Sequence, residues 1–170
     1  GTLTLNAGTV QVDAGMTAIL SNTVAGSAGL TKSGAGTLIL TNNNKSYTGT
    51  TAINEGALRI SATTANSMGS LTTGNLTLNG GRLETRFGAN QTLDYAISVG
   101  ASGGEIRNLG TDSQRATLGS GKVTGSGLLT LSFGSTDTRI AVNAQAGFAG
   151  KWLVDGGGLY GVNRFMDVAK

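Results

Sequence analysis

The chain has 170 residues, 29 of them glycine, and it contains no proline, cysteine or histidine. Without cysteine and histidine it cannot form a disulfide framework, a zinc finger, or a haem or iron–sulfur site, and it has no histidine for general acid–base catalysis. The net charge of +3 comes from 12 Lys and Arg against 9 Asp and Glu, with no basic run and no long apolar segment, so we expect neither nucleic-acid binding nor a membrane-spanning helix.

The first residues, Gly-Thr-Leu-Thr-Leu over 1–5, resemble the interior of a strand. They include no initiator Met and no basic stretch before an apolar one, so they are not a signal peptide. Nothing further along marks a linker. We therefore expect residues 1–170 to form a single β-helix segment of a longer protein.

Apolar residues alternate with Thr, Asn, Ser and Gly along most of the chain, at a spacing of i, i+2. Side chains two apart on a strand point to the same face, so each unit predicts a short strand with one apolar face. In chain order the pairs are Leu3 and Leu5, Val10 and Val12, Leu38 and Leu40, Leu58 and Ile60, Leu76 and Leu78, Ile97 and Val99, and Ile140 and Val142. The three pairs between residues 38 and 78 are predicted to lie in the core.

Three features favour a solenoid over a β-sandwich. The predicted strands are very short, glycine occupies the turns, and units return at unequal distances: residues 1–10 return as 74–83, and 24–30 as 123–128. A solenoid whose coils carry loops of variable length behaves in this way. The sequence therefore predicts an all-β parallel β-helix of about seven or eight coils, at roughly 20 to 25 residues per coil.

Residues 29–60 carry a more specific pattern. They read Gly-Leu-x-Lys-x-Gly-x-Gly-Thr-Leu-x-Leu, then an Asn-rich loop with an aromatic residue and Gly, then Thr-x-Ile, then Gly-x-Leu-x-Ile. This segment resembles the autotransporter-associated β-strand repeat of bacterial autotransporter passenger domains. A degenerate second copy runs from 127 to 159. The matching residues of the first copy are Gly29, Leu30, Lys32, Gly34, Gly36, Thr37, Leu38, Leu40, Tyr47, Gly49, Thr51, Ile53, Gly56, Leu58 and Ile60.

The resemblance implies a right-handed β-helix at the bacterial cell surface. It implies type V secretion through the outer membrane by a C-terminal β-barrel that lies outside this chain. The expected role is a non-enzymatic stalk that assists export, with no cofactor, and the expected partners are flanking coils of the parent chain. Two alternatives stay open: an adhesin surface for host or matrix ligands, and a polysaccharide-active β-helix enzyme.

Two glycine motifs resemble nucleotide-binding loops. Residues 156–161 satisfy Gly-x-Gly-x-x-Gly, but no helix is predicted after them, and such a turn needs one. Residues 118–123 resemble half a P-loop, but the first Gly is missing and Val123 follows the Lys where Ser or Thr is required. Both segments are predicted to be coil corners. Gly103-Gly104-Glu105 lacks the tandem pattern of calcium-binding repeats.

The acidic residues are scattered singly, and we interpret them as solvated carboxylates in turns. Stacked coils could still bring two of them together, as glycosidase chemistry requires. No catalytic, metal-binding or cofactor-binding residue is predicted. The nine acids are Asp13, Glu55, Glu84, Asp94, Glu105, Asp112, Asp137, Asp155 and Asp167.

Two smaller clusters and the chain ends complete the predictions. Arg82 and Arg86 flank Glu84 and could pair with it on a loop, and Phe148 and Trp152 are expected to form an aromatic cluster. The strand pattern at residues 2–5 and the short apolar stretch at 165–168 have no cap. Because uncovered strand edges recruit other chains, we expect the isolated segment to associate end to end.

Overall fold

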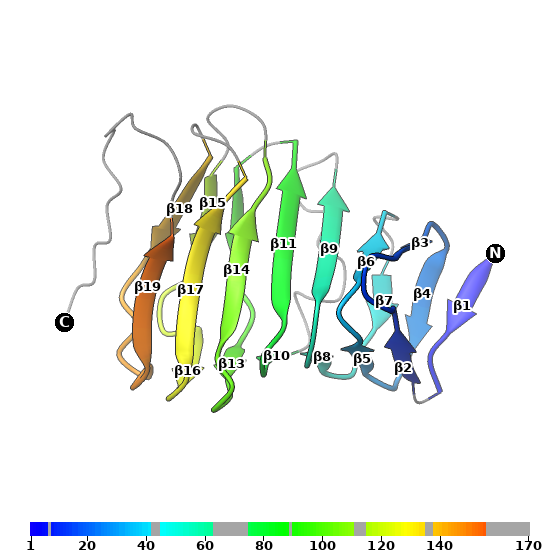
Figure 1. Cartoon of the computed structure of the whole chain (residues 1–170), viewed down its shortest axis with the longest axis horizontal. Helices are drawn as coiled ribbons and strands as arrows, with labels where there is room; N and C mark the ends of the chain where they lie inside the picture. Colours follow the sequence, from blue (N-terminus) through cyan, green and yellow to red (C-terminus); the bar gives the residue numbers. More distant parts are fainter. Residues whose placement is uncertain are drawn as a thin grey trace.

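The computed structural model describes residues 1–6, 8–41, 45–62, 75–88, 90–110, 115–134 and 138–155. In these ranges the chain forms 19 strands and no helix, and every strand pairing is parallel. The strands stack along the longest axis of the molecule, from β1 near the N-terminus to β19 (Figure 1). The predicted all-β parallel solenoid is therefore confirmed.

The strands form four sheets around the solenoid, and we name them sheets A to D. Sheet A consists of β1 (Thr2–Thr4), β4 (Thr23–Gly26) and β7 (Lys45–Tyr47). Sheet B consists of β2 (Gly8–Gln11), β5 (Leu30–Ser33), β8 (Thr51–Ile53), β10 (Leu76–Leu78), β13 (Ile97–Val99) and β16 (Val123–Gly125). Sheet C consists of β3 (Thr17–Leu20), β6 (Thr37–Leu40), β9 (Ala57–Ala62), β11 (Arg82–Phe87), β14 (Gly104–Asn108), β17 (Leu128–Phe133) and β19 (Lys151–Asp155). Sheet D consists of β12 (Gln91–Leu93), β15 (Arg115–Leu118) and β18 (Arg139–Val142).

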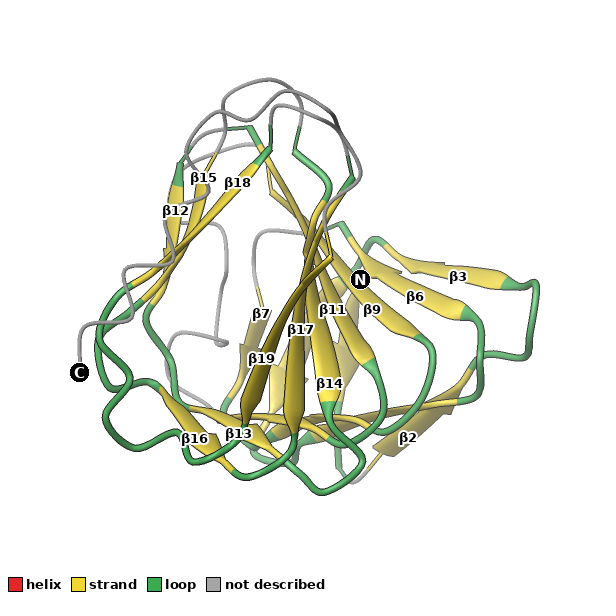
Figure 2. Cartoon of the chain, turned by 60° about the vertical axis from the view of Figure 1, so that its left-hand side comes forward, coloured by secondary structure: helices red, strands yellow, loops and turns green. Residues whose placement is uncertain are grey.

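The described strands make about six turns of the solenoid. Stacked residues are between 20 positions apart, as for Thr17 and Thr37, and 26 positions apart, as for Ile97 and Val123. The expectation of seven or eight coils counted all 170 residues, whereas residues 156–170 lie outside the described part. Sheets B and C run through nearly all turns, while the remaining face is split into sheets A and D (Figure 2).

The core is a stack of aliphatic residues from successive coils. In sheet C one inward row runs through Leu38, Leu58, Leu83, Ile106 and Leu131, each paired with the next. Every member of this row is buried. The six predicted core residues are all at most 1% exposed, which confirms the predicted register: Leu38, Leu40, Leu58, Ile60, Leu76 and Leu78.

Glycine is required at the corner between sheets B and C. Gly56 has a φ of 62°, in the left-handed region that other residues enter only with strain. A Cβ at this position would also collide with the carbonyl oxygen of Gly36 in the preceding coil. The glycine-rich turns therefore let the coils stack closely at this corner.

Candidate functional site

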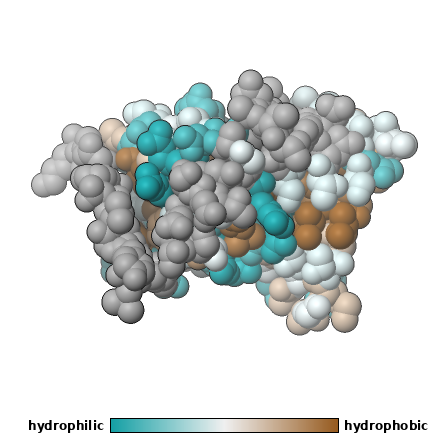
Figure 3. All heavy atoms as spheres, turned by 90° about the horizontal axis from the view of Figure 1, so that it is seen from above, coloured by the Kyte–Doolittle hydropathy of each residue, from teal (hydrophilic) through white to brown (hydrophobic). Residues whose placement is uncertain are grey.

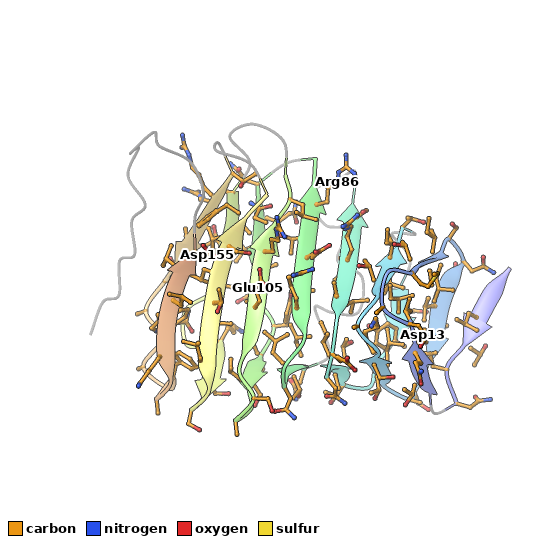
Figure 4. The ribbon with its side chains drawn as sticks, in the orientation of Figure 1. Asp13, Arg86, Glu105 and Asp155 are labelled. Atoms are coloured by element: carbon orange, nitrogen blue, oxygen red, sulfur yellow. The ribbon has the colours of Figure 1, made fainter. Side chains whose placement is uncertain are left out.

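Charged side chains gather on the outer face of sheet C. The register stacks Arg59 of β9, Glu84 of β11 and Arg107 of β14 in one outward row. A second outward row places Arg82 of β11 beside Glu105 of β14. Opposite charges thus alternate between neighbouring coils, with Glu105 near the middle of the face (Figure 4).

These residues form a connected chain of ion pairs and hydrogen bonds, which we call the ion ladder: Arg59, Glu84, Arg82, Glu105 and Ser132. The Nε of Arg59 donates to Glu84 Oε2 at 2.7 Å, and the Nε of Arg82 donates to Glu84 Oε1 at 2.9 Å. Glu105 accepts from Arg82 Nη1 at 3.4 Å through Oε2 and from the Ser132 hydroxyl through Oε1. The ladder therefore links four consecutive strands of sheet C.

The ion ladder corrects two predictions. Glu84 is not a solvated turn carboxylate, because it lies within β11 and is only 3% exposed. Of its two predicted partners, Arg82 pairs with Glu84, whereas Arg86 is exposed and takes part in no ion pair among the described residues. The second partner of Glu84 is Arg59 of the preceding coil. Side chains two apart on a strand share a face, but a partner in the adjacent coil lies closer still.

The two carboxylates of the ladder are brought together by one arginine. Glu84 and Glu105 contact the same guanidinium, that of Arg82. Both oxygens of each carboxylate accept a hydrogen bond. What the arrangement does is hold neighbouring coils together.

A shallow groove of about 400 Å³ runs beside the ladder at the corner between sheets B and C. Its lining includes the corner residues Gly56, Gly81 and Gly104, together with Arg82, Glu105 and Thr130. The groove crosses several coils. Neither the groove nor a role for Arg59 or Ser132 was predicted from the sequence. The one sequence feature that points to Arg59 is that this basic residue lies one coil before the acidic Glu84.

A lysine stands in the otherwise aliphatic core of sheet B. Lys32 is fully buried and stacks between Val10 and Ile53. Its ammonium donates to the carbonyl oxygens of Ser33 at 2.7 Å, Gly34 at 2.6 Å and Glu55 at 3.3 Å. Burial lowers the pKa of Lys32, and the nearby Glu55 carboxylate partly opposes that shift. The lysine thus joins the corners of two consecutive coils.

Two tyrosines are also buried. The Tyr47 hydroxyl lies 2.7 Å from Thr51 Oγ1, with which it shares a hydrogen bond. Tyr95 is buried, and its hydroxyl has no hydrogen-bond partner within the part of the chain that the structure describes. Burial raises the pKa of both phenols. Both therefore stay protonated over the physiological range, which suits core residues.

The remaining sequence motifs occupy turns and packing contacts. Within residues 118–123, Lys122 pairs with Asp94 at 3.3 Å in an exposed turn between β15 and β16. The rings of Phe148 and Trp152 meet edge to face, with centroids 4.8 Å apart, and pack against the core. The predicted aromatic cluster is therefore present.

Of the other acids, Asp155 lies on β19 beside Ser132 of the ion ladder. Asp13 and Asp155 lie near opposite ends of the molecule (Figure 4). Among the described residues, no group of three or more His, Cys, Asp or Glu could hold a metal ion, and no helix could cross a membrane. Residues 156–161, Asp112, Asp137 and Asp167 lie outside the described residues.

Comparison with known proteins gives one match. No curated protein and no solved structure matches the chain significantly. The passenger-associated-transport-repeat family matches residues 30–60, which form β5 to β9 and hold Lys32 and the Gly56 corner. The resemblance to a repeat of autotransporter passengers is thus confirmed over this segment.

Proposed function

We propose that this chain is a structural, non-enzymatic segment of an autotransporter passenger, which extends the passenger from the cell and assists its export. The observation that carries the proposal is where the matched repeat lies. The described strands within residues 30–60 belong to two consecutive coils and pair with each other in parallel register. Lys32 links neighbouring corners through its hydrogen bond to the Glu55 carbonyl, and Gly56 lets those corners lie close together.

The proposal places the chain outside the outer membrane, reached by type V secretion. Its partners would be flanking coils of a longer passenger, stacked in the same parallel register. The right-handed sense implied by the resemblance is part of the proposal, since crossovers between parallel strands of one sheet are almost always right-handed. Stacking on coils that are already folded would favour stepwise folding at the cell surface.

The paired state of the acids supports a non-enzymatic role. Glu84 and Glu105 are engaged by arginines, and Asp13 lies toward the other end of the molecule from Asp155. The adhesin alternative has one observation in its favour, the groove beside Arg82 and Glu105, which could bind a host or matrix ligand. A loss of matrix binding in an Arg82→Ala variant that keeps its fold would favour this alternative.

A display assay tests the proposed function. The chain is inserted between an N-terminal epitope and an autotransporter β-barrel, and the epitope is quantified on intact cells. Leu40→Asn places an amide in the core, while Thr41→Asn changes the exposed residue next to it. We expect normal display for the parent chain and Thr41→Asn and reduced display for Leu40→Asn. Equal display of all three would contradict a role for the folded solenoid in export.

A further inference from the structure

The groove at the corner between sheets B and C extends along the axis of the solenoid. Its lining residues lie at or close to the start of five neighbouring strands of sheet C, which are β6, β9, β11, β14 and β17. The starts of these strands follow one another along the lower side of sheet C (Figure 1). Because paired strands are about 4.8 Å apart, five of them give the groove a length of roughly 19 Å. A groove of this length suits a linear ligand of several units that lies across the strands.

The groove is polar, but its charges balance. Among the described lining residues the charged ones are Arg82 and Glu105, which pair with each other at 3.4 Å. Ser102 and Thr130 add hydroxyl groups. Arg82 uses Nε and Nη1 in the ion ladder, while its Nη2 has no hydrogen-bond partner in the part of the chain that the structure describes. The lining thus offers both donors and acceptors without an excess charge that favours an anion or a cation.

One large apolar side chain of the lining is exposed. Leu128 is 44% exposed although its strand, β17, lies between β14 and β19. Its exposure therefore has a different origin from that of the apolar residues visible toward the N-terminal end from above, where the stack of described strands begins (Figure 3). An aliphatic side chain beside hydroxyls and a charge pair suits a ligand that presents both C–H and hydroxyl groups.

The main chain beside the groove is already paired between coils. The Arg82 amide donates to the Gly56 carbonyl at 2.9 Å, and the Glu105 amide donates to the Gly81 carbonyl at 3.2 Å. The corner is therefore not a free strand edge to which an extended peptide adds through its main chain. The groove is also shallow, so it has no deep pocket for an anchoring side chain of a protein partner.

We propose that this groove binds a neutral linear oligosaccharide, which lies along the axis of the solenoid. A sugar hydroxyl both donates and accepts, so it matches the spare donors of Arg82, the carboxylate of Glu105 and the hydroxyl of Thr130. The C–H face of a sugar ring matches Leu128. The inference gives a class of ligand to the groove of the adhesin alternative. It goes beyond the structural role and does not depend on it.

Titration followed by backbone amide chemical shifts tests the class of ligand on the full chain. The neutral probes are hexamers of glucose, of N-acetylglucosamine and of mannose. The comparison probes are a heparin hexasaccharide and a pool of capped hexapeptides. We expect saturable shifts with a neutral hexamer, centred on Ser102, Gly103 and Leu128. No shift with any neutral hexamer, shifts centred elsewhere in the chain, or tighter binding of heparin or of the peptides would overturn the proposal.

Two matched pairs of variants test the site. Ser102→Trp fills the groove, whereas Ala101→Trp places the same ring at the adjacent exposed residue, which is outside the lining. Leu128→Ala removes the apolar contact, and Leu3→Ala is its control at an exposed leucine of the first coil. We expect each groove variant to weaken binding of the neutral hexamer about fivefold or more, and each control to change it less than about twofold.

Circular dichroism verifies that all four variants fold. Binding by the groove variants that is as tight as binding by their controls would overturn the proposal. The display assay keeps this result separate from the proposed role in export, because Leu128→Ala should lose sugar binding and still be displayed normally.

Discussion

Lys32 is buried in the core and yet makes polar contacts. Its row in sheet B is aliphatic on either side, at Val10 and Ile53, yet its ammonium has three carbonyl acceptors from two coils. A buried ammonium is tolerated when its donors are satisfied. The lysine of the matched repeat is therefore best explained as a link between corners.

Lys32→Met keeps the length of the side chain and removes its donors. We expect the free energy of unfolding to fall by about 1 to 3 kcal/mol, because three part-buried hydrogen bonds to a charged donor are lost. Lys122→Met is the control, since that lysine is paired only in an exposed turn. Urea denaturation measures both, and a change as small for Lys32→Met as for the control would show that the three hydrogen bonds contribute little.

The stability difference between the parent chain and Lys32→Met should also depend on pH. Burial lowers the pKa of Lys32 in the folded state below its unfolded value of about 10.4. Between these two values the unfolded state binds more protons, so the contribution of Lys32 to stability rises with pH across that window. Denaturation of both proteins from neutral pH to about pH 10 measures it. A difference that falls with rising pH would contradict the direction of the shift.

Glu84 is the residue on which the ion ladder depends, because it holds two arginines at once. Glu84→Gln should lower the free energy of unfolding by about 1 to 3 kcal/mol, since a nearly buried carboxylate loses its charge beside Arg59 and Arg82. Asp94→Asn breaks an exposed pair and should change it by at most about 0.5 kcal/mol. Equal effects in thermal or urea melts would place Glu84 among ordinary surface charges.

The sequence predicted which face of a strand a residue occupies better than it predicted contacts between residues one coil apart. The i, i+2 spacing placed Leu58 and Ile60 in the core correctly, because that face depends only on the strand itself. The pairing of Glu84 with Arg59 depends on the register between coils, which varies with loop length. When the register between coils is unknown, the sequence indicates this pair only by placing a basic residue one coil away from an acidic one.

At the scale of the strand, β6 offers a direct test of the register. Leu40 is buried while its neighbour Ile39 points outward. Leu40→Ala should lower the free energy of unfolding by about 2 to 5 kcal/mol through the cavity that it leaves. Ile39→Ala should lower it by less than about 1 kcal/mol, because the side chain is only partly covered. Reversed effects would mean that the register is shifted by one residue.

At the corner between sheets B and C, glycine is needed for two different reasons, the backbone conformation and the lack of space for a side chain. Gly15 and Gly56 both have a left-handed φ, but an added Cβ meets nothing within 4 Å at Gly15 and collides with the preceding coil at Gly56. Gly15→Ala should therefore cost only about 1 to 2 kcal/mol of backbone strain. Gly56→Ala should cost about 2 to 5 kcal/mol, since overpacking adds to that strain. Similar losses in both would show that the corners are not tightly stacked.

The elements themselves were predictable where the coils are regular. The matched repeat has coil spacings of 20 residues in sheet C, from Thr37 to Ala57, and 21 residues in sheet B, from Leu30 to Thr51. Beyond it, coils of up to 26 residues hide the period. The split of one face into sheets A and D has no signature in the apolar spacing, because each of those strands still shows the same short alternation.

For the whole molecule, the two ends differ in chemistry. The strands of the first coil carry no charged residue, whereas the edge strand β19 at the far end has exposed Lys151 and Asp155. Charges on an edge strand oppose pairing with another chain.

The central claim is that the chain forms one continuous parallel solenoid in which each strand pairs with strands one coil away. Nuclear Overhauser effects between backbone protons test it most directly at Leu83 in the middle of sheet C. The account predicts contacts from Leu83 to Leu58 and to Ile106, its partners in the preceding and following coils. Contacts that instead pair β11 antiparallel with β10, the strand next to it in sequence, would indicate hairpins and contradict the solenoid.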